Sequence, residues 1–241
     1  MKANLYIELL KSAINSYLYF GTDSAISNAK FFNNSKWLIP NALKPHTLCN
    51  RSQLDFLERM MIHLIESKVA GDFVEAGFWR GGNSIFMRGF LKVRGENRQV
   101  ILIDPFIGGG TLSTCYVSNE QFDTWTNRLV SELEEVKTHF NRYGLLDDFI
   151  SFCHGKISEI EFPNSVSKIA LARLDVGSYE SYSHALNKIH PLMAKGGCVI
   201  LGDWHLESCR AAVYDFIRNN QLNALISELF KGDLADAHFF I

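Results

Sequence analysis

Short apolar runs alternate with helical patterns along this chain from about residue 50 onwards. The clearest run is Gln99-Val100-Ile101-Leu102-Ile103-Asp104, and similar runs occur at 73–76, 149–152, 169–175, 198–201 and 237–241. Apolar stretches of this length, bounded by turn residues, are typical of buried strands. Helical patterns lie between them, at 54–65, 85–91, 131–143, 179–193 and 211–219. Strands separated by helices predict an α/β fold in which helices flank a mainly parallel sheet.

The first 50 residues do not follow this alternation. Residues 1–20 are apolar enough to suggest a signal peptide, but Glu8 and Lys11 interrupt them and the apolar residues recur at helical spacing. We therefore expect an amphipathic helix that docks on the rest of the protein. This interpretation divides the chain into an N-terminal extension, residues 1–50, and one compact α/β unit, residues 51–241.

Charge, hydropathy and cysteine content exclude several kinds of partner. The 24 Lys and Arg residues are balanced by 26 Asp and Glu residues, so the chain lacks the basic excess that attracts nucleic acid. No stretch reaches the roughly 20 apolar residues that span a membrane. The five cysteines form no CxxC pair, and their odd number favours reduced thiols over a disulfide framework. We expect a cytoplasmic protein that binds neither nucleic acid nor a membrane.

Polar residues follow the predicted strands at their carboxyl ends. They are Glu75, Asp104, His154 with Gly155, Asp175, and Asp203. In an open parallel sheet, ligands bind beyond these ends, near the point where the strand order reverses. The sequence therefore predicts a ligand site at this edge of the sheet.

A glycine-rich turn, residues 77–82, follows the first predicted strand. Glycines let a ligand approach backbone N–H groups closely. The turn matches neither the GxGxxG dinucleotide motif nor the GK[ST] ending of a phosphate-binding loop. Asp104 ends the next strand, where a carboxylate suits both hydroxyls of a ribose, although it could instead cap the following helix. Together these two features favour a nucleoside-containing ligand.

Several segments resemble the macrocin-type O-methyltransferases, which use S-adenosylmethionine to methylate sugars of antibiotics and other natural products. They are VAGDFVEAGFWRGG at 69–82, FNRYGLLDD at 140–148, RLD at 173–175 and YES at 179–181. The similarity extends to the opening helix and to PHT at 45–47, so it covers nearly the whole chain. It implies a class I methyltransferase fold, which is a Rossmann-like, mostly parallel sheet of seven strands with flanking helices. It also implies an N-terminal helical lid and a homodimer or larger homo-oligomer.

The resemblance implies an S-adenosylmethionine site that can be assigned residue by residue. The candidate cofactor-binding residues are Thr47, Glu75, Gly77, Arg80, Asn83, Ser84, Asp104, His154, Gly155 and Asp175. Among these, Asp104 matches the acid that holds the ribose, and His154 with Gly155 matches the segment beside the adenine. Thr47 lies on the lid segment, near the methionine end of the cofactor. Arg80 could face the cofactor carboxylate or merely a surface acid.

The catalytic motifs of the family are only partly kept. Members carry an Asp-x-Asp sequence at the end of one strand and an Asp-Asp pair at the end of the next. Three of these carboxylates hold Mg²⁺ against the sugar diol, and the second Asp of Asp-x-Asp is the base. Here the motifs read Asp175-Val176-Gly177 and Gly202-Asp203. Asp175 and Asp203 remain as candidate metal ligands and as groups that position the acceptor, but the loss of two negative charges weakens cation binding.

His205 is the leading candidate for a replacement base. It follows Asp203 by two residues, and histidine titrates near neutral pH, although a surface loop histidine is the alternative. Trp79, Trp125 and Trp204 could line an apolar acceptor pocket or belong to the core. The segment 106–125 has the composition of an active-site loop.

The sequence therefore predicts a methyltransferase that acts on a small-molecule acceptor. We expect transfer from S-adenosylmethionine to a natural-product or sugar-like hydroxyl in secondary metabolism, with or without Mg²⁺. The alternative is a non-catalytic S-adenosylmethionine-binding subunit that regulates or scaffolds a biosynthetic pathway. The two changes from carboxylate to glycine, at Gly177 and Gly202, are the features that separate these hypotheses.

Overall fold

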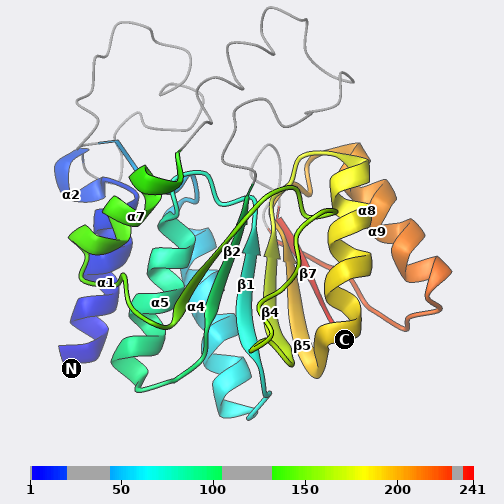
Figure 1. Cartoon of the computed structure of the whole chain (residues 1–241), viewed down its shortest axis with the longest axis horizontal. Coiled ribbons are helices and arrows are strands. Elements are labelled where there is room, and N and C mark those ends of the chain that lie inside the picture. Colours follow the sequence, from blue (N-terminus) through cyan, green and yellow to red (C-terminus); the bar gives the residue numbers. More distant parts are fainter. Residues whose placement is uncertain (1, 21–43, 105–131, 230–235) are drawn as a thin grey trace, which may run out of the picture.

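A computed structural model describes residues 2–20, 44–104, 132–229 and 236–241, and within them a single seven-stranded sheet forms the centre of the molecule (Figure 1). The strands are β1 (Asp72–Ala76), β2 (Val100–Asp104), β3 (Ile150–His154), β4 (Ile169–Leu174), β5 (Met193–Leu201), β6 (Ser227–Leu229) and β7 (Asp236–Phe240). Their order is β3-β2-β1-β4-β5-β7-β6. Neighbouring strands from β3 to β5 pair in parallel, and β7 is antiparallel to both of its neighbours. The predicted α/β fold with a mostly parallel sheet is confirmed.

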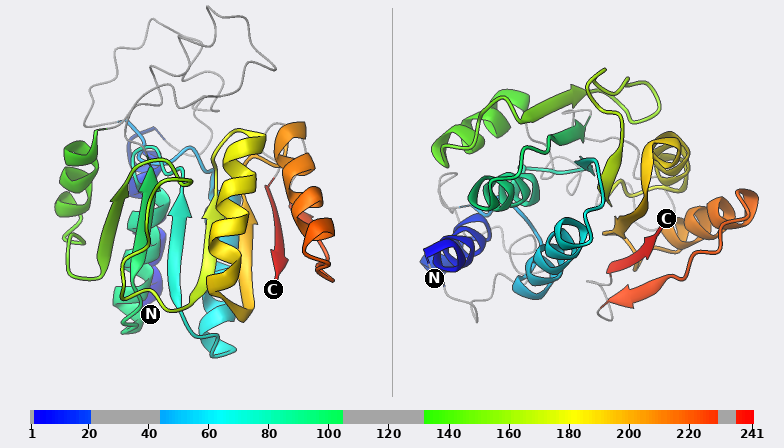
Figure 2. Two further views of the ribbon diagram at one scale, coloured as in Figure 1. Left: turned by 45° about the vertical axis from the view of Figure 1, so that its right-hand side comes forward. Right: turned by 90° about the horizontal axis from the view of Figure 1, so that it is seen from below.

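Helices cover both faces of the sheet. They are α1 (Lys2–Ile14), α2 (Tyr17–Phe20), α4 (Arg51–Glu66), α5 (Gly82–Arg94), α7 (Leu133–Arg142), α8 (Tyr179–Ile189), the short 3₁₀ helix His190–Leu192, and α9 (Glu207–Asn219). Figure 2 shows α8 and α9 on one face and α1, α4 and α5 on the other. The connections from β1 to β2, from β2 to β3 and from β4 to β5 contain α5, α7 and α8, as the alternating sequence pattern predicts, whereas residues 155–168 between β3 and β4 form no helix.

Two hydrophobic cores lie on opposite faces of the sheet. Successive residues of a strand point to opposite faces. Phe73 of β1 and Leu102 of β2 pack in the core beneath α1, α4 and α5. Val74 and Ile103, their neighbours in sequence, pack in the core beneath α8 and α9. The central strands are therefore buried on both sides, which is why they read as continuous apolar runs.

The N-terminal helix docks on the α/β unit, as its periodicity predicts. The side chains of α1 that enter the core beside α4 and α5 are Ile7, Leu10 and Ile14. Leu5 and Leu9, on another side of the same helix, are exposed. Ser16 has a φ of +63° and separates α1 from α2. Within the described parts of the chain, no helix has the length and apolar character needed to cross a membrane.

Three features near the C-terminus differ from the sequence prediction. Gly196 and Gly197 do not end a helix but lie inside β5, because that strand starts at Met193. Gly196 has a φ of +80°, and a Cβ on Gly197 would lie 2.8 Å from the carbonyl oxygen of Ala194, so this stretch of β5 requires glycine. Helix α9 starts at Glu207 rather than at residue 211. The three-residue strand β6 was not predicted, because it is too short to show a period.

Candidate active site

The carboxyl ends of the parallel strands bring the predicted site residues to one edge of the sheet. Asp104 pairs with His154 across β2 and β3. Ala76, Leu174 and Leu201 lie at one level of β1, β4 and β5, so the residues that follow them share the same edge. The strand order reverses between β1 and β4, where ligands of open α/β sheets bind. The predicted site edge is therefore formed.

The glycine turn after β1 is shaped by the neighbouring chain segments. Gly77 has a φ of +76°, and a Cβ there would lie 1.9 Å from the carbonyl oxygen of Asp175. A Cβ on Gly82 would lie 2.5 Å from the carbonyl carbon of His46, whose oxygen accepts a hydrogen bond from the Gly82 N–H at 2.8 Å. Close approach of the protein's own backbone therefore demands these two glycines, in addition to any ligand.

Asp104 contacts this turn directly. The backbone N–H of Phe78 donates a hydrogen bond of 3.4 Å to the Asp104 Oδ2. Asp104 is half-buried, and its own carbonyl oxygen accepts a hydrogen bond from the N–H of Gly155. The acid at the end of β2, the glycine turn after β1 and the start of the loop after β3 thus meet at one place.

Glu75, Asn83 and Ser84 form a buried network under the turn. The Glu75 carboxylate accepts hydrogen bonds from Asn83 Nδ2 at 3.0 Å and from the Ser84 hydroxyl, and it has no exposed surface. Burial raises the pKa of Glu75, and the charge of Arg173 opposes the rise. These three side chains point toward one another and fix the turn from beneath. A direct contact between them and a cofactor stays a prediction.

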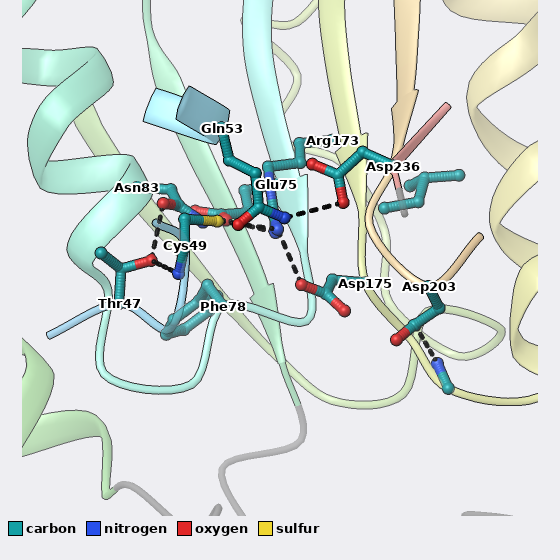
Figure 3. Close-up of polar contacts among 12 residues, drawn as sticks. Thr47, Cys49, Gln53, Glu75, Phe78, Asn83, Arg173, Asp175, Asp203 and Asp236 are labelled. Carbon is teal, nitrogen blue, oxygen red and sulfur yellow. Dashed lines mark hydrogen bonds and ion pairs between the residues drawn. The ribbon is translucent and has the colours of Figure 1, made fainter. Parts of the chain in front are cut away.

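Thr47 ties the segment before α4 to the same network (Figure 3). Its hydroxyl donates to Asn83 Oδ1 at 2.8 Å and accepts from the backbone N–H of Cys49 at 3.0 Å. The side chain is buried. The structure therefore brings Thr47 to the site edge, as the resemblance implies, and shows that it also holds the first turn of α5.

Arg80 pairs with an acid of the protein. Its Nη1 lies 2.7 Å from Glu135 Oε1 on α7, and its Nη2 lies 3.2 Å from His139 Nε2. His139 in turn stacks on His46, with ring centroids 4.2 Å apart. Burial lowers the pKa of His46 to about 3, and the nearby His139 and Arg80 add to the effect. Arg80 thus pairs with an acid of the protein, and its contact with the cofactor carboxylate stays a prediction.

Arg173 is one of two site residues to which the sequence analysis gave no role. Its Nη1 lies 3.1 Å from Glu75 Oε1 and its Nη2 lies 2.8 Å from Asp175 Oδ2, so it joins the end of β1 to the end of β4 (Figure 3). Nη2 also lies 3.4 Å from the Cys49 Sγ. The residue is 4% exposed. A charged residue in the apolar run 169–175 was the available signal, because a buried charge requires a partner.

Asp236 at the start of β7 is a second residue that was not predicted. It accepts a hydrogen bond from Gln53 Nε2 at 3.0 Å and is buried. Burial raises its pKa to about 7, while Arg173 opposes the rise. Asp236 and Arg173 line the same small cavity, together with Cys49 and Asn83. Because β7 runs antiparallel to β5, its first residue reaches the site edge, which the sequence could not show without the strand order.

Asp175 and Asp203, the two acids that remain of the family's catalytic motifs, are both engaged by donors. Asp175 accepts from Arg173, and Asp203 Oδ2 accepts from the backbone N–H of Gly177 at 2.8 Å and from the Tyr182 hydroxyl at 3.2 Å. Burial, and then the charge of Asp175, raise the pKa of Asp203 well above its ordinary value. Mg²⁺ requires near-octahedral oxygen coordination. With glycine at position 202, Asp175 and Asp203 supply only two of the three carboxylates of the centre that the resemblance implies, and each already holds a donor on Oδ2, so the residues present do not fit that centre.

A group of acidic side chains that could attract a cation lies elsewhere in the described residues, between α1 and α4. Among them, the one group of three or more His, Cys or acidic side chains with ligand atoms within 4.8 Å of one another is Glu8, Asp55 and Glu58. Lys11 Nζ contacts all three carboxylates of that group. The group thus joins α1 to α4, away from the strand ends.

The remaining candidates lie at the edge but differ in exposure. His205 is exposed in the turn after β5, and His154 is exposed at the end of β3. Trp204 is buried and donates from Nε1 to Glu228 Oε1 at 3.0 Å, so it belongs to the core rather than to a pocket. Trp79 is half-buried with a φ of +50°. Trp125 and the predicted loop 106–125 lie outside the described residues.

Comparison with known proteins gives a consistent set of relatives. A family model described as macrocin-O-methyltransferase (TylF) matches residues 39–231. The 8-demethyl-8-(2,3-dimethoxy-alpha-L-rhamnosyl)-tetracenomycin-C 4'-O-methyltransferase of Streptomyces olivaceus is 32% identical over 94% of this chain and 89% of its own length. The mycinamicin III 3''-O-methyltransferase of Micromonospora griseorubida is 28% identical over 93% and 92%. The solved structure of the O-methyltransferase NovP has a TM-score of 0.80 and 25% identity, covering 99% of this chain and 98% of that chain.

Proposed function

The chain belongs to the macrocin-O-methyltransferase (TylF) family, and we propose that it transfers a methyl group from S-adenosylmethionine to a hydroxyl of a natural-product or sugar-like acceptor in secondary metabolism. One observation carries the proposal more than any other. The backbone of the glycine turn contacts the carboxylate of Asp104, beside the switch point of the sheet. A nucleoside bound at such a place meets backbone donors and a ribose-binding acid together.

Different residues around this contact would bind different parts of the cofactor. Asp104 would accept hydrogen bonds from the ribose hydroxyls, and the segment His154-Gly155 beside it would flank the adenine. The turn that begins at Gly77 would lie against the methionine end, near Thr47. Glu75, through its buried hydrogen bonds, would keep the turn in the shape that this binding needs.

When bound, S-adenosylmethionine supplies an activated methyl group on a sulfonium. The chain's own task is to hold the acceptor oxygen in line and to accept its proton. We propose that His205 accepts the proton that leaves the acceptor hydroxyl. This histidine is exposed next to the carboxyl end of β5. Asp175 and Asp203 would position the acceptor through their carboxyl oxygens. The segment 106–125, which has the composition of an active-site loop, would contribute to the choice of acceptor.

Label transfer tests the proposed reaction. Purified protein is incubated with methyl-labelled S-adenosylmethionine and a panel of glycosylated natural products that carry free sugar hydroxyls. We expect label on at least one acceptor and a fall in turnover of about 100-fold or more in His205→Gln. The matched control is His184→Gln, an exposed histidine on α8. No labelled product, despite cofactor binding, would favour the non-catalytic subunit.

The proposal also includes a cellular location and an oligomeric state. We propose a cytoplasmic location, which is supported by the free thiols of the described cysteines Cys49, Cys153, Cys198 and Cys209. We also propose a homo-oligomer, which is supported by Leu5 and Leu9, 72% and 54% exposed on α1. Light scattering that returned the 27.3 kDa mass of one chain would contradict the oligomer.

A further inference from the structure

The space beside Asp175 that an acidic side chain would need is already filled by an ion pair. A Cβ on Gly202 would lie 2.9 Å from Asp175 Oδ2 and 3.0 Å from Arg173 Nη2. Both atoms belong to the salt bridge of 2.8 Å between these two side chains. A carboxylate at position 202 would therefore meet the guanidinium in the place where a metal centre would need a third ligand.

Acidic side chains lie around the positive charge of Arg173, in the way that they would lie around a bound metal cation. It contacts Glu75 on β1 and Asp175 after β4. Asp236 precedes Ala237, the partner of Leu201, so it lies across from Gly202 on the neighbouring strand. Figure 3 shows Arg173 between these carboxylates. A guanidinium keeps its charge at all relevant pH values and offers five N–H donors in a fixed plane.

Asp203, on the other side of Asp175, is held by donors that a metal ion would have to replace. The Gly177 N–H and the Tyr182 hydroxyl both point at its Oδ2. Gly177 has a φ of +75°, a backbone conformation that glycine adopts readily. The backbone at this position is thus arranged to give an N–H to Asp203 rather than to present a further carboxylate.

We propose that Arg173 is the resident cation of the acceptor side of this site, where it orients Asp175, and that no divalent metal ion binds between Asp175 and Asp203. This inference rests on the proposed function for its meaning, since it specifies how the acceptor site of a methyltransferase works. Arg173 is a positioning residue, because it acts through Asp175 and Glu75. An acceptor oxygen is then held by hydrogen bonds to carboxyl groups and not by chelation to a metal.

Direct binding of Mn²⁺, a paramagnetic probe for Mg²⁺ sites, tests the inference without any acceptor. Electron paramagnetic resonance measures the free Mn²⁺ that remains when the ion is added to the full chain. We expect the wild type to leave the free signal unchanged at up to millimolar Mn²⁺, as the variant Asp175→Asn does. One equivalent bound by the wild type and lost in Asp175→Asn would overturn the proposal.

Two Arg173 variants separate the role of a resident cation from a purely structural one. Arg173→Met removes the positive charge from among the carboxylates, so we expect the folded variant to gain Mn²⁺ binding. Arg173→Lys keeps the charge and should bind none. A folded Arg173→Met variant without Mn²⁺ binding would overturn the role of Arg173.

A second variant keeps the test decisive if circular dichroism shows that Arg173→Met is unfolded. Arg173→Gln also removes the positive charge but keeps N–H donors for the carboxylates, so this folded variant should gain Mn²⁺ binding that the wild type does not show. A folded Arg173→Gln variant that binds no more Mn²⁺ than the wild type would overturn the role of Arg173. Calorimetry with S-adenosylhomocysteine on the same samples tests the proposed function separately, because that measurement requires no metal.

Discussion

Gly77 illustrates how one residue serves the fold and the site together. Its positive φ lets β1 turn sharply, and the missing side chain lets the carbonyl of Asp175 approach. The N–H of Gly77 also continues the sheet by donating to the Ile103 carbonyl at 3.0 Å. The turn that would face the cofactor is thus fixed by the two strands on either side of β1.

Replacing Gly77 by alanine should destabilise the protein strongly. The left-handed conformation and the collision with the Asp175 carbonyl together predict a loss of about 2 to 5 kcal/mol in the free energy of unfolding. Gly95→Ala is the matched control, since Gly95 has a φ of +69° but a Cβ there would meet nothing within 4 Å. We expect a loss of about 1 kcal/mol for that control. Equal losses in urea unfolding would contradict the role of close approach.

Asp236 should make stability depend on pH in a defined direction. Its pKa is about 7 in the fold, against about 3.8 in the unfolded chain, so between these values the folded state holds a proton that the unfolded state has lost. The free energy of unfolding should therefore fall as pH rises through this window, by up to about 1.4 kcal/mol per pH unit from this group.

The variant Asp236→Asn isolates this contribution. The amide keeps an oxygen that can accept from Gln53 but does not titrate. Urea unfolding at several values between pH 4 and pH 8 should show the variant becoming more stable relative to the wild type as pH rises. Asp148→Asn, at an exposed aspartate, is the control. A constant difference between Asp236→Asn and the wild type would contradict the assignment.

At the scale of elements, helix α1 is joined to α4 by a buried lysine. Lys11 is 1% exposed, and its ammonium contacts Glu8 on its own helix and Asp55 and Glu58 on α4. The carboxylates are partly exposed, which weakens each ion pair by solvent screening. The apolar contacts of Leu10 and Ile14 complete the interface.

Replacing Lys11 by methionine should loosen α1 from the body of the protein. The stem is retained, but three acidic groups lose their common partner, so we expect a loss of about 1 to 3 kcal/mol in the free energy of unfolding. Hydrogen exchange should also become faster in α1 than in α8. Lys92→Met is the control, because Lys92 is half exposed and lies 3.6 Å from Asp147. Unchanged exchange in α1 would show that apolar contacts alone hold the helix.

The sequence predicts most elements because their patterns are local. The apolar run 99–104 and the stripe of α4 through Leu54, Leu57, Met61 and Leu64 are visible without any tertiary information, and both are confirmed. The capping box of Asn50 and Gln53 fixes the start of α4 in the same local way. β6 and the early start of β5 depend on strand pairing, which has no local signal.

The contacts of the candidate site likewise differ in whether the local sequence can predict them. The meeting of Asp104 with the glycine turn follows from strand ends and could be predicted. The inward direction of Glu75 could not, because it depends on Arg173, which comes 98 positions later in the chain. Asp236 reaches the site only through the antiparallel pairing of β7 with β5.

For the molecule as a whole, two cores on opposite faces hold the sheet so that one edge carries the chemistry. The contacts among β1, β2 and β4 fix the relative places of the glycine turn, Asp104 and Asp175. The ion pairs of Arg173 tie Glu75 on β1 to Asp175 after β4, and so join the proposed cofactor side of this edge to the proposed acceptor side. The proposed function requires that an adenosyl ligand binds across the ends of β1 and β2.

Isothermal titration of the full chain with S-adenosylhomocysteine tests that claim most directly. We expect one site per chain in the wild type. We also expect affinity about 10- to 100-fold weaker in Asp104→Ala, from the loss of hydrogen bonds to a charged group, and unchanged affinity in Asp148→Ala, which removes an exposed carboxylate. No binding to the wild type, or equal affinity in Asp104→Ala, would contradict it.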